Sequence, residues 1–135
     1  MENVWAIGPL QVVLEKQVME NHYVVIEGKQ IFNICEAQEL PIQCEIFETN
    51  SNVTLFPGMI DQHIHGIAGA DAMDGTLESL EIISKTLAKH GVTSFLATTM
   101  TADIEALQQV VHTIYKQKDN VNGAKIVGIH LEGPF

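Results

Sequence analysis

The order of structural signals after residue 55 is the feature that most restricts the fold. Short apolar runs occur at 56–64, 94–98 and 125–131, and between them lie two stretches in which apolar residues recur every three or four positions, as on one face of a helix. These recurring residues are Leu77, Leu80, Ile83, Leu87, Ile104, Leu107, Val111 and Ile114. An order of strand, helix, strand, helix, strand at this spacing is typical of βαβ units, so we predict a parallel sheet with helices on its outside.

The segments around the two predicted helices indicate where each helix begins. Threonine is favoured at the N-cap position, so Thr76 is predicted to cap the first helix and Thr101 the second. The run Thr98-Thr99-Met100-Thr101 is interpreted as a turn that ends in this cap. Residues 66–75, which contain glycines, are predicted to form a loop.

The first 55 residues have a different pattern. Short runs around 12–14, 23–26 and 30–34 mix apolar and polar residues as β-strands do, and Glu27-Gly28-Lys29 is typical of a hairpin turn. Cys35 and Cys44 match no CxxC spacing, so we interpret them as ordinary reduced thiols. We therefore predict a small β-rich module before the α/β segment.

Charge and hydropathy exclude several classes of partner. The formal net charge of −10 repels the phosphates of nucleic acids and anionic membrane surfaces. The sequence contains no apolar run of the ~20 residues that cross a bilayer, and its first residues lack the basic region of a secretory signal. We expect a cytoplasmic protein with a small-molecule or protein partner, and with neither nucleic acid nor membrane as a partner.

Two histidines lie at the end of the first predicted strand of the α/β segment. Residues two apart in a strand project to the same side, so His63 and His65 are expected to present two imidazoles to one point. Imidazole nitrogens bind ions such as zinc, iron and nickel. On spacing alone, two incidental polar residues at a strand end are the alternative interpretation.

A second group of polar residues follows the third predicted strand. His130 and Glu132 are expected to share a face, and the preceding run 126–129 is apolar enough to be buried on both sides. A carboxylate beside such a strand is costly unless its charge is compensated. Taken alone, Glu132 could be solvated, with His130 a hydrogen-bonded core residue. Because both groups lie at the carboxyl ends of neighbouring parallel strands, where (β/α) barrels carry their active sites, we predict a shared metal site of His63, His65 and Glu132.

Three runs of the sequence resemble a known family. The runs 55–66 (LFPGMIDQHIHG), 91–99 (GVTSFLATT) and 128–135 (GIHLEGPF) are similar to the N-acetylglucosamine-6-phosphate deacetylases of the amidohydrolase superfamily. The Pro-Gly-x-Ile-Asp-x-His-x-His pattern of the first run is shared by many amidohydrolases. The His-Leu-Glu-Gly-Pro-Phe pattern of the third is more particular to the deacetylases.

The resemblance implies a fold and an activity. Residues 56–135 would form the first three strands of a (β/α)8 metallo-dependent hydrolase barrel, and residues 1–55 would form part of a small β-sandwich domain. The implied reaction is metal-dependent hydrolysis of the acetamide of N-acetylglucosamine 6-phosphate to glucosamine 6-phosphate and acetate. Glu132, His63 and His65 would bind one or two divalent ions of the zinc or iron type per full-length chain. The full-length protein is expected to be a homo-oligomer.

In the family, further ligands and a catalytic aspartate come from later strands. We therefore expect the general base beyond Phe135, and we expect this chain to be an N-terminal fragment without activity of its own. Two alternatives stay open. One is another amidohydrolase, such as a cyclic-amide hydrolase, which would need a lysine on a later strand. The other is a non-catalytic truncated module that binds a metal or a protein partner.

Overall fold

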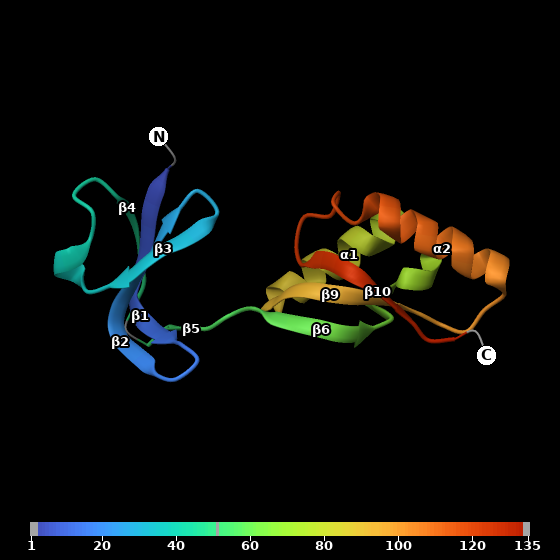
Figure 1. The fold of residues 1–135 in the computed structure, drawn as a ribbon, viewed down its shortest axis with the longest axis horizontal. Coiled ribbons are helices and arrows are strands. Elements are labelled where there is room, and N and C mark those ends of the chain that lie inside the picture. Colours follow the sequence, from blue (N-terminus) through green and yellow to red (C-terminus); the bar gives the residue numbers. More distant parts are fainter. Residues whose placement is uncertain (1–2, 51, 134–135) are drawn as a thin grey trace. The chain divides into compact units, whose positions relative to one another are not determined.

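The computed structural model describes residues 3–50 and 52–133 and divides the chain into two compact units (Figure 1). The first unit is Met1–Pro57 and the second is Gly58–Phe135. The described helices are too short or too polar to cross a membrane. Each unit has its own hydrophobic core.

The first unit is a five-stranded sheet with the order β3-β2-β1-β4, in which β5 also pairs with β1. Its elements are β1 (Val4–Val13), β2 (Val18–Glu27), β3 (Gln30–Cys35), the 3-10 helix η1 (Ala37–Glu39), β4 (Glu45–Glu48) and β5 (Thr54–Leu55). The predicted turn between β2 and β3 is confirmed, and Gly28 supplies its positive φ of 59°. The sequence pattern placed the first strand too late, because β1 begins at Val4. Cys35 is buried and Cys44 half-buried, both as free thiols.

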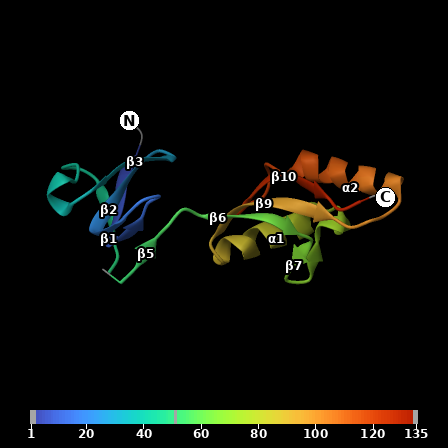
Figure 2. The same cartoon turned by 60° about the horizontal axis from the view of Figure 1, so that its bottom comes forward.

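The second unit is built on three parallel strands (Figure 2). Strand β9 lies between β6 and β10, and the helices α1 and α2 connect the strands in the predicted order. The elements are β6 (Met59–Ile64), β7 (Gly66–Ile67), β8 (Ala70–Asp71), η2 (Ala72–Asp74), α1 (Leu77–Lys89), β9 (Val92–Thr99), α2 (Ile104–Gln117) and β10 (Lys125–Leu131). The predicted mixed α/β architecture is confirmed. The described residues form an open sheet and not a closed barrel.

One face of the parallel sheet packs against the helices. Phe95 and Ala97 of β9 are fully buried against apolar residues of both helices. The helical residues of this cluster are Leu80, Ile83, Leu87, Val110 and Ile114. Burying a side chain of the size of Phe95 stabilises the fold by about 1.5–3 kcal/mol, so this cluster is the main source of stability for the second unit. Strands β6 and β10 each pair only with β9 among the described residues, which leaves one edge of each strand unpaired.

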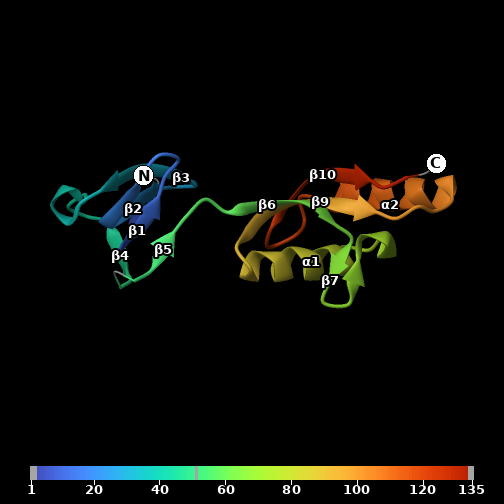
Figure 3. The same cartoon turned by 90° about the horizontal axis from the view of Figure 1, so that it is seen from below.

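The structure corrects three local predictions. Residues 66–75 are not a loop, because β7 and β8 form a hairpin, shown at the end of β6 in Figure 3, and η2 follows it. The strand predicted at 94–98 is confirmed at Thr98 and continues to Thr99, so that both threonines are buried residues of β9 and the turn predicted from Thr98 onward is wrong for them. Thr101 does not cap α2, whose N-cap position is held by Asp103. Thr76 does cap α1, and its Oγ1 accepts a hydrogen bond from the Ser79 backbone N–H.

Candidate metal centre

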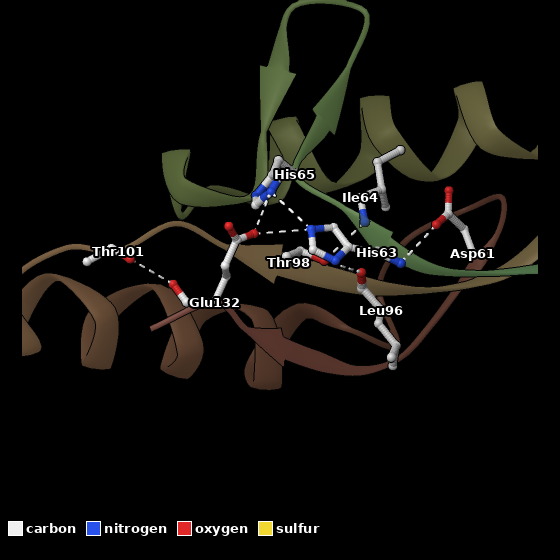
Figure 4. Close-up of polar contacts among 8 residues, drawn as sticks. All are labelled: Asp61, His63, Ile64, His65, Leu96, Thr98, Thr101 and Glu132. Atoms are coloured by element: carbon white, nitrogen blue, oxygen red, sulfur yellow. Dashed lines mark hydrogen bonds and ion pairs between the residues drawn. The ribbon is translucent and has the colours of Figure 1, made fainter. Parts of the chain in front are cut away.

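Three side chains meet at the carboxyl end of the parallel sheet (Figure 4). His63 lies near the end of β6, His65 directly follows that strand, and Glu132 directly follows β10. The Nε2 atoms of His63 and His65 are 3.2 Å apart. Oε2 of Glu132 lies 3.1 Å from Nε2 of His63 and 3.0 Å from Nε2 of His65. The structure therefore brings together all three residues that the sequence predicted as ligands.

The separations of these atoms suit a shared cation. Ligand atoms about 2.1 Å from a zinc ion lie roughly 3.0 Å apart in octahedral and 3.4 Å apart in tetrahedral geometry. The three separations here fall within or close to that range. Two imidazoles and a carboxylate are also the donor set that zinc and similar ions prefer.

Two atoms of this group lack ordinary hydrogen bonds. Nδ1 of His65 and Oε2 of Glu132 are both buried, and neither has a hydrogen-bond partner of good geometry among the described residues. Oε2 is close to both imidazoles, yet these contacts do not meet the angular requirement of a hydrogen bond. Buried polar atoms without partners are rare in folded proteins and need an explanation. A cation held between the three residues would satisfy Oε2, and a hydrogen-bond acceptor for Nδ1 of His65 would complete the site.

The neighbouring polar side chains hold the backbone of these residues. Oδ1 of Asp61 accepts a hydrogen bond from the His63 backbone N–H at 3.0 Å, and Oγ1 of Thr98 accepts one from the Ile64 backbone N–H at 3.0 Å. Oγ1 of Thr101 donates to the Glu132 carbonyl at 3.0 Å. All three contacts appear in Figure 4. The local pattern around Thr98 and Thr101 predicted only a turn and a helix cap, and gave no signal for these contacts.

Other histidines of the second unit, and Asp71, lie outside the group of three. The ring of His130 lies beside that of His63, with centroids 4.6 Å apart, but His130 is not one of the three converging ligands. His90 and His112 are exposed on or next to the helices. Asp71 caps the 3-10 helix η2 by accepting from the Met73 N–H. Pro134 and Phe135, the end of the resemblance motif, lie outside the described residues.

Comparisons with known proteins identify relatives of the chain, although no protein-family model matches it. The N-acetylglucosamine-6-phosphate deacetylase of Bacillus subtilis (strain 168) is 40% identical over 134 residues, which are 96% of this chain and 34% of that protein. The crystal structure of the N-acetylglucosamine-6-phosphate deacetylase from Pasteurella multocida matches with a TM-score of 0.87 at 26% identity, covering 98% of this chain and 35% of that one.

A third relative is the D267A mutant of the Mycobacterium smegmatis deacetylase, solved in complex with N-acetyl-D-glucosamine-6-phosphate. Its TM-score is 0.75 at 24% identity, over 98% of this chain and 33% of that one, and this likeness shows the fold alone. The described unit of β6, β9 and β10 thus has a counterpart in proteins about three times as long. The chain is a homologue of the N-acetylglucosamine-6-phosphate deacetylases and spans about a third of their length.

Proposed function

We propose that the intact protein hydrolyses the acetamide of N-acetylglucosamine 6-phosphate to glucosamine 6-phosphate and acetate. The observation that carries the proposal is the convergence of His63, His65 and Glu132 at the carboxyl end of a parallel sheet, in a homologue of enzymes named for this reaction. In (β/α) barrels this end of the sheet is where catalysis takes place. The proposal also takes residues 56–135 as the first three strands of such a barrel and residues 1–55 as part of a β-sandwich domain.

The three residues would serve as ligands of a divalent ion of the zinc or iron type. Such an ion supplies a Lewis acid and lowers the pKa of a bound water. The Glu132 carboxylate would compensate the positive charge of the ion, and His63 and His65 would bind it through imidazole nitrogens. Thr101 holds the Glu132 carbonyl, which fixes the turn after β10 from which the carboxylate projects. We expect the general base, further ligands and the residues that bind the sugar phosphate to come from outside this chain.

The test is a deacetylation assay on the intact protein with N-acetylglucosamine 6-phosphate, following the release of acetate. Glu132→Gln keeps the shape of the side chain and removes its charge, so it should lower kcat/KM by at least about 100-fold, since even outer-shell partners of a metal contribute 10–100-fold. Glu78→Gln, on the exposed side of α1, is the matched control and should retain full activity.

Two further measurements make this assay decisive. Removing divalent ions with a chelator should abolish acetate release, and adding zinc or iron back should restore it. A Glu132→Gln variant that deacetylates at the normal rate would contradict the proposed role of Glu132. A wild-type protein that opens a cyclic amide and leaves the acetamide intact would replace the proposed substrate class with that of another amidohydrolase.

A further inference from the structure

The pairing of β6 with β9 is irregular at the candidate ligand His63. Asp61 is paired with Phe95 and Ile64 with Ala97, so two residues of β6, Gln62 and His63, lie opposite one residue of β9. This arrangement of two residues against one is a β-bulge, and bulges change the direction in which side chains project.

The bulge decides which face of the sheet the imidazoles occupy. Paired residues of neighbouring strands project to the same face, and Phe95 and Ala97 project into the core beneath the helices. Regular alternation from Asp61 would therefore direct His63 and His65 into that core. The bulge shifts the alternation by one residue, so that Ile64 packs against the core instead. His63 and His65 are then free to meet Glu132 on the other face.

Two side chains accept the backbone N–H groups at the bulge. Asp61 accepts from the N–H of His63, and Thr98 accepts from the N–H of Ile64, each at 3.0 Å. The Thr98 hydroxyl also lies 3.3 Å from the carbonyl of Leu96, to which it donates. Since Leu96 is the residue of β9 opposite the bulge, one buried hydroxyl links the backbones of both strands at this position (Figure 4).

We infer that Asp61 and Thr98 are positioning residues that hold this bulge and thereby hold His63 and His65 in the geometry that binds a metal. Neither residue is a ligand, and each acts through a backbone N–H of the segment that carries the two imidazoles. A backbone N–H that loses its acceptor no longer stabilises the arrangement in which that hydrogen bond is made. Without these acceptors, regular pairing of β6 with β9 becomes more favourable relative to the bulge. Regular pairing would turn the two imidazoles away from Glu132. This role rests on the proposed metal site and names the residues that would hold its two histidines in place.

The experiment is a titration of the metal-free intact protein with Co²⁺, whose visible absorption reports ligand geometry. Thr98→Val keeps the shape of the side chain and removes the hydroxyl. It should weaken Co²⁺ binding by about 10–100-fold, the range for outer-shell partners of metal ligands, and change the absorption spectrum. Thr98→Ser restores the hydroxyl and should recover both the affinity and the spectrum.

Thr99→Val is the matched control. Thr99 is the next residue of β9 and is equally buried, but its hydroxyl has no hydrogen-bond partner among the described residues. This substitution should leave Co²⁺ binding unchanged. Asp61→Ala provides a second probe if Thr98→Val does not fold, and it should weaken binding, with Asp61→Asn recovering part of the affinity because its amide oxygen can still accept from His63.

The outcomes separate this inference from the proposed function. If Thr98→Val and Asp61→Ala bind Co²⁺ with wild-type affinity and spectrum, the positioning role is wrong while the metal site stands. Equal losses in Thr98→Val and Thr99→Val would also overturn it, since packing alone would then explain the effect. If the wild-type protein binds no Co²⁺ and Glu132→Gln is fully active, the metal site itself fails.

Discussion

The polar side chains before and after strand β10 differ in whether they have hydrogen-bond partners. Before the strand, Glu81 of α1 accepts hydrogen bonds from the backbone N–H and the side-chain amide of Asn122, at 2.7 and 3.1 Å. Lys85 lies 2.7 Å from the same carboxylate, and Ser84 exchanges two hydrogen bonds with the backbone of Ala124. After the strand, Glu132 has a buried oxygen without a hydrogen-bond partner among the described residues.

If the carboxyl end binds a metal as proposed, the contrast separates polar groups that stabilise the fold from polar groups arranged for a ligand. The polar groups before β10 connect the preceding loop to α1, and they are hydrogen-bonded or ion-paired with one another. Two of the three buried side-chain atoms without a hydrogen-bond partner among the described residues belong to His65 and Glu132, at the carboxyl end of the sheet. Functional sites commonly reduce stability, because their groups are arranged for a ligand and not for each other. Substitutions at the two ends should therefore affect different properties.

The largest effect should come from the carboxyl end. Replacing both His63 and His65 by Ala in the intact protein should lower metal affinity by at least about 10-fold. Losing a residue that only contacts a metal ligand already costs about 10–100-fold, and losing two ligands should cost no less. The free energy of unfolding of the metal-free protein should stay the same or rise. Metal content per chain and thermal unfolding are the measurements, with His112→Ala on the exposed face of α2 as control. Unchanged metal content would remove the two histidines from the site.

Gly123 tests the other end of the strand. A Cβ at this position would lie 2.5 Å from the carbonyl oxygen of Ser84, a backbone atom that cannot move aside easily. Gly123→Ala should therefore lower the free energy of unfolding by about 1–3 kcal/mol, with unchanged metal affinity in the folded protein. Gly128→Ala, within β10, is the control, because its Cβ would approach only the flexible end of the Leu96 side chain. Equal stability of the two variants would contradict the proposed tight contact.

The smallest effect concerns the pH dependence of stability. Hydrogen bonds from Lys85 and Asn122 lower the pKa of Glu81 to about 2 from its ordinary value of 4.5. A lowered pKa in the folded state adds stability above about pH 4.5, and this contribution is lost as the pH falls towards 2. Glu81→Gln should thus flatten the stability curve in this range.

A suitable comparison for Glu81→Gln is Asp119→Asn. The side chain of Asp119 is 86% exposed and lies 3.9 Å from Lys118, so its ion pair should contribute little. Chemical denaturation between pH 2 and pH 6 measures both variants. Identical curves for Glu81→Gln and the wild type would show that the link to Asn122 does not depend on the charge.

Periodicity predicted the scaffold of the second unit because its strands and helices bury regular apolar stripes. The two helices, the three parallel strands and the cap at Thr76 follow from local pattern alone. Leu77 and Ile104 were assigned to these stripes but are 41% and 58% exposed, since each lies in the first turn of its helix, where the core is thinner. The hairpin of β7 and β8 was missed because strands of two residues are too short to show alternation.

The site was predictable in its residues but not in its geometry. His63, His65 and Glu132 are recognisable by residue type and by position at strand ends. The bulge has no signal in the sequence, because the two residues of β6 that lie opposite Leu96, Gln62 and His63, are both polar. The hydroxyl of Thr98 acts on a backbone 34 residues away in sequence, and Glu81 on one 41 residues away. Such contacts depend on tertiary structure and have no local signal.

The unpaired edges of β6 and β10 have a consequence for how such a protein is made. An exposed strand edge can pair with another chain, and apolar residues beside these edges, such as Ile60 and Val127, are more than half exposed. Parallel sheets also form slowly, because their strands are joined by long connections. A nascent chain that has left the ribosome only as far as β10 would therefore expose two unpaired strand edges that can pair with other chains. Chaperones that cover these edges during synthesis should therefore raise the yield of the protein.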